Sequence, residues 1–108
     1  MKLMTEEMEK KLAQNKPGAL SNKPYLKLFN PLGNARWLIT EYYPETGILY
    51  GLCDLGHGCP EIGSVSIEEL EETHVGLGLG IERDILWSPE KTLTEYANTA
   101  RKAGRIEL

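Results

Sequence analysis

The chain has 108 residues, close to the commonest size of a single domain, so we expect one domain over residues 1–108. Hydrophobic residues make up 41% and charged residues 26%, proportions that argue against disorder. No apolar run approaches the roughly 18 residues of a membrane span, and residues 1–11 lack the apolar stretch of a secretory signal. We therefore expect a cytoplasmic protein without a membrane partner, with Cys53 and Cys59 as reduced thiols.

The net charge of -4 is unevenly distributed along the chain. Residues 1–27 carry six lysines against three glutamates, whereas residues 41–84 carry ten acids against Arg83 alone. The strongly basic footprint of a nucleic-acid-binding domain is absent, which disfavours direct binding of nucleic acid. An acidic region either suits a basic partner or serves solubility, and solubility is the commoner role of charge runs.

The first two thirds of the chain predict one helix followed by strands. Thr5 is placed to cap a helix, and Met4, Met8 and Leu12 recur every four residues as on one helical face. A turn-rich loop follows, and then short segments of alternating or continuous apolar character separated by Gly, Pro and Asn. The predicted helix covers residues 5–14, and the predicted strands cover residues 25–29, 36–43, 48–55 and 61–65.

The last third predicts two helices around an extended segment. Ser66 with Glu69 makes a capping box that opens a short helix ending near residue 73. Residues 81–87 predict a last strand or extended segment, and Ser88 before Pro89 predicts the start of a helix that Gly104 ends. Together these elements predict an α+β fold, with an antiparallel sheet of about four to five strands packed with two to three helices.

The loop at residues 53–61 gathers residue types that bind metals or act as nucleophiles. Cys53, Asp54, His57, Cys59 and Glu61 fall within nine positions, and two glycines would let the backbone fold around an ion. Structural zinc sites usually use paired spacings such as C-x-x-C, which this loop lacks. We therefore expect no metal site and favour a glycine-rich turn at a strand end, with Asp54, His57 and Cys59 as the candidate ligands should a metal bind.

A second candidate is the cluster Glu82-Arg83-Asp84. Its carboxylates are hard oxygen ligands suited to Mg²⁺ or Mn²⁺, and Arg83 could hold a phosphate. The alternative is a strand with outward charges in weak exposed ion pairs, which we favour. We predict no bound cofactor unless the nuclease hypothesis below holds, in which case the ion is Mg²⁺ or Mn²⁺.

Two further patterns have ordinary structural explanations. The glycine run at residues 76–80 resembles a phosphate-binding loop, but the strand-to-helix context of a nucleotide fingerprint is missing. We expect these glycines to allow close packing or positive φ angles. Trp37, Tyr42, Tyr43 and Trp87 could stack bases if they lie exposed beside Arg36 and Lys27, although aromatic residues on strands more often pack in the core.

Several sequence blocks resemble the bacterial domain of unknown function 2958 family, and the similarity covers nearly the whole chain. These blocks are KLMT at 2–5, FNP at 29–31, WLITE at 37–41, YGLCDLG at 50–56, CPEIG at 59–63, SIEEL at 66–70 and GLGIERD at 78–84. The resemblance implies a small stand-alone protein, often carried on plasmids, phages or other mobile elements. Some relatives bear a single-stranded-DNA endonuclease name. Residues 57–58 and 15–23 depart from the family pattern, which lowers the weight of His57 as a functional residue.

These observations lead to two hypotheses of function. The first is a non-enzymatic binding module of a mobile element, acting on conjugation, replication or host defence through a protein partner that is itself basic or binds nucleic acid. The second is a metal-dependent endonuclease for single-stranded DNA. In that case Glu82 and Asp84, with Asp54 and Glu61 from the neighbouring loop, would hold the metal while Arg83 holds the phosphate. The nuclease requires the segments at 53–61 and 80–84 to meet in space.

Overall fold

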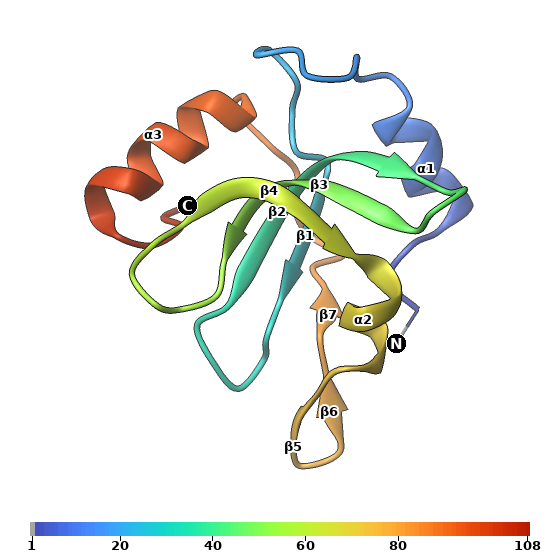
Figure 1. Ribbon diagram of the computed structural model, residues 1–108, viewed down its shortest axis with the longest axis vertical. Coiled ribbons are helices and arrows are strands. Elements are labelled where there is room, and N and C mark those ends of the chain that lie inside the picture. Colours follow the sequence, from blue (N-terminus) through green and yellow to red (C-terminus); the bar gives the residue numbers. More distant parts are fainter. Residues whose placement is uncertain (1) are drawn as a thin grey trace.

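The structure is a computed structural model that describes residues 2–108, so Met1 lies outside the described residues. Its main sheet has five strands in the order β4-β3-β2-β1-β7, every neighbouring pair antiparallel (Figure 1). The predicted α+β class with an antiparallel sheet is confirmed. The elements are α1 (Glu6–Leu12), β1 (Leu26–Phe29), β2 (Arg36–Tyr43), β3 (Ile48–Asp54), β4 (Glu61–Ser66), α2 (Ile67–Glu72), β5 (His74–Gly76), β6 (Leu79–Gly80), β7 (Glu82–Arg83) and α3 (Leu93–Ala103).

Strands β1 to β4 follow one another across the sheet because short turns connect them. The turn after β1 contains Pro31 and Gly33, and the turn after β2 contains Pro44 and Gly47, whose φ of 72° favours glycine. Strand β7 comes later in the chain and pairs with β1 at the opposite edge from β4. The sheet therefore brings the segment after residue 80 next to the first strand.

One face of the sheet is covered by α1, α2 and the N-terminal segment. Leu26, Leu28 and Ile39 point to this face and have no exposed surface. Burial of this kind contributes roughly 1.5–3 kcal/mol for each large apolar side chain. The buried core on this face consists of Leu3, Met4, Leu12, Leu26, Leu28, Trp37, Ile39, Leu49, Ile67, Leu70 and Ile81.

The opposite face is covered by α3 over only part of its area (Figure 1). Leu38 and Leu52 are opposite each other on β2 and β3 and pack under α3. The helix contributes Leu93, Tyr96, Ala97 and Ala100, and Ile106 from the segment after it completes the cluster. Further along the same strands, polar residues replace the apolar ones, and this part of the face carries the candidate site.

Hydrogen bonds from the capping residues determine where the helices begin and end. One of the predicted helix ends differs from the structure. The hydroxyls of Thr5 and Ser66 accept from backbone N–H groups in the first turns of α1 and α2, as expected. Gly104 ends α3 with a φ of 76°, also as expected. The predicted start of α3 at Ser88 is wrong. The cap is Thr92, because Thr92 and Glu95 complete a reciprocal capping box.

A small hairpin, β5–β6, projects beyond the sheet (Figure 1). It corresponds to the glycine run at residues 76–80. Gly76, Leu77 and Gly78 have φ angles of 118°, 53° and 74°, so positive φ is the role of Gly76 and Gly78. Gly80 instead allows the close approach of the Thr73 carbonyl oxygen. The part of the chain that the structure describes has no helix long and apolar enough to cross a membrane.

Candidate functional site

A polar groove with a volume of about 780 Å³ lies on the α3 side of the sheet. Its floor is the part of the sheet that α3 leaves uncovered. Its walls are the turn after β1, the loop after β3, and the end of α3 with the residues that follow. Charged and amide side chains that line it are Lys27, Asn34, Arg36, Asp54, Arg105 and Glu107. We call this cavity the groove.

The pairing of the strands explains why these side chains share one floor. Phe29 on β1 is opposite Arg36 on β2, and Arg36 is opposite Asp54 on β3. Residues opposite each other in an antiparallel pair point to the same face. Lys27 is two residues before Phe29 and therefore points to this face as well. The intervening Leu28 points into the core on the other side.

Asp54 joins the floor of the groove to two of its walls. Its side chain is 1% exposed. One carboxylate oxygen accepts from the backbone N–H of Gly56 at 2.9 Å, and the other accepts from the backbone N–H of Ile106 at 2.9 Å. Hydrogen bonds to a charged acceptor are about twice as strong as neutral ones. Asp54 therefore fixes both the loop after β3 and the segment after α3.

The cations of the groove differ in how they are paired. Lys27 Nζ lies 3.0 Å from Asp84 Oδ2, with both side chains largely shielded from solvent. Arg105 lies 3.8 Å from Glu107 in an open, exposed pair, which is worth little energetically. Arg36 is half-buried and has no hydrogen bond or ion pair to a side chain among residues 2–108.

Lys27 and Asp84 form the most shielded ion pair of the described residues. Burial alone would raise the pKa of Asp84, but hydrogen bonds from Lys27 and from the backbone N–H of Leu86 outweigh it and lower that pKa. The Lys27 ammonium also lies 5.5 Å from the centre of the Trp87 ring and 5.9 Å from that of Phe29. These contacts hold Lys27 at the end of the groove nearest β7.

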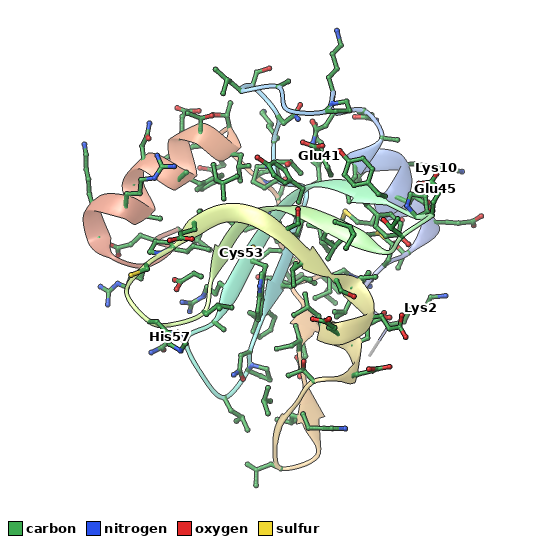
Figure 2. All side chains as sticks on the ribbon, viewed as in Figure 1. Lys2, Lys10, Glu41, Glu45, Cys53 and His57 are labelled. Carbon is green, nitrogen blue, oxygen red and sulfur yellow. The ribbon has the colours of Figure 1, made fainter. Side chains whose placement is uncertain are left out.

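The loop at residues 53–61 does not bring its metal-ligand residue types together. Cys53 lies within the sheet, whereas His57 lies on the outer edge of the loop (Figure 2). Burial raises the pKa of Cys53 to about 11, so its thiol stays protonated at neutral pH. Cys59 and Glu61 are exposed. Among residues 2–108 no three His, Cys, Asp or Glu side chains are grouped to hold a metal ion.

The segment at residues 80–84 lies at the other edge of the sheet. Asp84 and Asp54 point to the same face, but β1 and β2 lie between them, which separates their strands by about 14 Å. Glu82 is opposite Phe29 and also points to this face. Arg83 points to the other face, where its guanidinium donates to the carbonyl oxygen of Leu3 at 3.3 Å. The structure does not bring the segments 53–61 and 80–84 into one site.

The aromatic residues singled out in the sequence are divided between packing roles. Trp37 is 4% exposed in the core under α1 and α2. Trp87 donates its indole N–H to the carbonyl oxygen of Pro24 at 2.9 Å and packs beside Tyr96. The hydroxyl of Tyr43 donates to Glu41, which raises the pKa of Tyr43. They do not form one stacking surface with Arg36.

The ten acids of residues 41–84 do not form a single surface either. Glu41 and Asp54 are buried, and Asp84 is paired with Lys27. Glu41 also accepts from the backbone N–H of Gly18 at 3.0 Å and so holds the loop after α1. The largest exposed group is on α2 and consists of Glu68, Glu69, Glu71 and Glu72.

Sequence reasoning identified Asp54 but missed most of the groove. The sequence indicates Arg36 and Lys27 only as possible neighbours of aromatic residues, and it gives no signal for Arg105. These residues come from three distant parts of the chain, and only the strand order unites them. One usable signal is Ile106, an apolar residue between the charged Arg105 and Glu107. Its position indicates that the segment after α3 is anchored to the core, where Ile106 is buried.

Comparison with known families decides where the chain belongs. The family model described as "Protein of unknown function (DUF2958)" matches residues 3–107. The chain belongs to the DUF2958 family. The match confirms the family resemblance of the sequence blocks over nearly the whole chain. No curated protein and no solved structure matches it.

Proposed function

We propose that this DUF2958 protein is a non-enzymatic protein-binding module, and that it engages its partner through the β5–β6 hairpin. The proposal is based on the exposure and the backbone conformation of Leu77. Its side chain is 89% exposed at the tip of a projecting hairpin, and its φ is 53°. A leucine costs roughly 1–2 kcal/mol in this left-handed conformation. Strained residues of this kind are typical of functional sites.

The turn itself does not require a leucine. In two-residue hairpin turns with two positive φ angles, Asn or Gly is the favoured first residue. Leu77 is therefore unfavourable for the turn and exposes a large apolar side chain to water. Both costs are offset if Leu77 enters an apolar pocket of a partner. Large apolar side chains inserted in this way commonly anchor protein interfaces.

The surroundings of Leu77 indicate what kind of partner fits. Leu32, 47% exposed on the turn after β1, lies next to Gly76 and extends the apolar area. Helix α2 directly precedes the hairpin and contacts β6 at its base. All four of its glutamates are exposed, and it has no basic residue. The partner that matches is a protein with an apolar pocket bordered by basic groups.

The setting implied by the family resemblance is a plasmid or phage. In that setting the partner belongs to the machinery of conjugation, replication or host defence, and a basic, nucleic-acid-binding protein has the matching charge. The metal-dependent nuclease is the competing proposal. It has less support, because two strands separate Asp54 on β3 from Glu82 on β7.

The test is capture of host or phage proteins by immobilised wild-type protein and by the Leu77→Asn variant. We expect Leu77→Asn to fold with at least wild-type stability, because Asn tolerates positive φ, and to lose the captured partner. Leu86→Asn is the matched control, since Leu86 is 90% exposed but does not have positive φ. Equal capture by wild type and Leu77→Asn, or capture lost equally in Leu86→Asn, would contradict the proposal.

A further inference from the structure

We propose that the groove on the α3 side is a binding site for the phosphate group of a nucleotide-sized ligand, held by Arg36 and Arg105. This site is separate from the hairpin that carries the proposed function. A cavity of about 780 Å³ lies within the roughly 300–1,000 Å³ range of small-molecule sites. The charged groups that line it determine the class of ligand.

The inference rests chiefly on the position of Arg36 and on its lack of a side-chain partner among the described residues. Arg36 is half-buried on the floor of the groove, yet no side chain among residues 2–108 pairs with it. Partial burial of an unpaired guanidinium is unfavourable unless an anion or water satisfies its donors. A guanidinium presents its N–H groups in a planar fork that matches two oxygens of a phosphate.

The nearest acid on the sheet is not positioned to neutralise Arg36. Asp54 is opposite Arg36 on β3, but its two oxygens accept from the N–H groups of Gly56 and Ile106. No oxygen of Asp54 lies within 4.0 Å of a side-chain nitrogen of Arg36. Asp54 therefore holds the loop after β3 and the segment after α3 in place. The guanidinium of Arg36 remains available to a ligand.

Arg105 supplies the second cation, from the wall formed by the residues after α3. Its only ion-pair contact among residues 2–108 is with Glu107 at 3.8 Å, and both side chains are mostly exposed. A phosphate in the groove displaces so loose a pair at little cost. Lys27 is held by Asp84 and adds positive potential at one end, and the amide of Asn34 adds a donor at the rim.

A nucleotide is the class that also uses the neighbouring ring. Phe29 is not one of the residues that line the groove, but it is half-buried on the same face, directly opposite Arg36. A planar base can stack on such a ring while its phosphate binds the guanidinium. The ligand class is thus a phosphate monoester on a planar, nucleoside-sized body.

The experiment is a titration of the full chain with adenosine 5′-monophosphate, followed by the amide resonances of Gly56, Gly58 and Ile106. We expect these resonances to shift on binding, and adenosine without phosphate to produce at least about tenfold weaker binding. An oligonucleotide with a 5′-phosphate, compared with the same strand bearing a 5′-hydroxyl, shows whether the end of a strand can supply the phosphate.

Three variants locate the site. Arg36→Gln and Arg105→Gln should each weaken binding about tenfold or more, while Arg101→Gln, on the exposed surface of α3, should bind like the wild type. Arg105 is so exposed that its variant tests the site even if Arg36→Gln misfolds. Leu77→Asn should bind the nucleotide normally, which separates this inference from the proposed function. No binding at millimolar nucleotide, equal binding of adenosine, or wild-type binding by both groove variants would overturn the inference.

Discussion

The two faces of the sheet differ in how completely helices cover them. On the α1 and α2 side, eleven buried residues form a continuous apolar core. On the α3 side, seven buried residues form a smaller core, and the polar groove lies beside it. Because side chains alternate along a strand, Leu28 and its neighbours Lys27 and Phe29 belong to different environments.

This difference shows how a small domain can be both stable and open to a ligand. The covered face supplies most of the apolar burial, so the uncovered part of the other face is free to carry charges. The same two strands, β1 and β2, contribute apolar residues to the covered face and charged residues to the groove. A substitution in these strands should therefore have an effect on stability that depends on the face to which the side chain points.

The largest expected effect is that of Leu28→Ala on the covered face. Leu28 is fully buried, and its truncation should lower the free energy of unfolding by about 3 kcal/mol, through lost burial and the cavity left behind. Urea denaturation measures the loss. Arg36→Gln, on the groove face, should cost less than about 1 kcal/mol. Equal losses in the two variants would show that the groove face is packed like a core, contrary to the comparison.

The next effect is expected from Asp54→Asn. The amide has one acceptor oxygen and a donating NH₂, so it cannot accept from both Gly56 and Ile106. The free energy of unfolding should fall by about 2 kcal/mol, and the Ile106 amide should exchange faster with solvent. Urea denaturation and hydrogen exchange provide the two measurements.

Glu61→Gln is the matched control for Asp54→Asn. Glu61 is an exposed carboxylate on the neighbouring strand, and its change should stay within about 0.5 kcal/mol. If Asp54→Asn were as stable as the wild type, the carboxylate would not be holding the walls of the groove. Asp54 would then be available to a ligand, and the assignment of Arg36 as an unneutralised cation would fail.

Local patterns in the sequence were sufficient for most of the fold. The bounds of β2, the caps at Thr5 and Ser66 and the end of α3 at Gly104 depend on neighbouring residues, and all were predicted. The start of α3 was predicted at Ser88 because two capping signals lie close together. Thr92 is the cap, since only its capping partner, Glu95, completes both hydrogen bonds.

The candidate site could not be predicted in the same way, because it depends on contacts between distant segments. The pairing of β7 with β1, only two residues long, determines that Asp84 meets Lys27 and not Asp54. The groove also needs the segment after α3 to cross back to the sheet, where the buried Ile106 side chain and its backbone hydrogen bond to Asp54 hold it. The pairing of β7 has no local signature, and the contact after α3 is indicated only by the apolar Ile106 between two charged residues. The glycine run, in contrast, predicted close packing or positive φ angles, and Gly76 and Gly78 have positive φ.

The smallest expected effect concerns the ion pair between Lys27 and Asp84, at the β7 edge of the sheet. Asp84→Asn removes the ion pair with Lys27 and should lower the free energy of unfolding by less than about 1 kcal/mol, because the pair is partly exposed. Since the folded state lowers the pKa of Asp84, its contribution is present above the ordinary value of 3.8 and is lost as the pH falls through the folded pKa. Thermal unfolding of wild type and variant should thus differ at neutral pH and converge in acid. A difference that persists or grows in acid would show that Asp84 acts through something other than its charge.

The same two proteins, incubated with single-stranded DNA and Mn²⁺, also test the nuclease hypothesis. Cleavage by the wild type that Asp84→Asn abolishes would favour the nuclease and would require a catalytic site at this edge of the sheet.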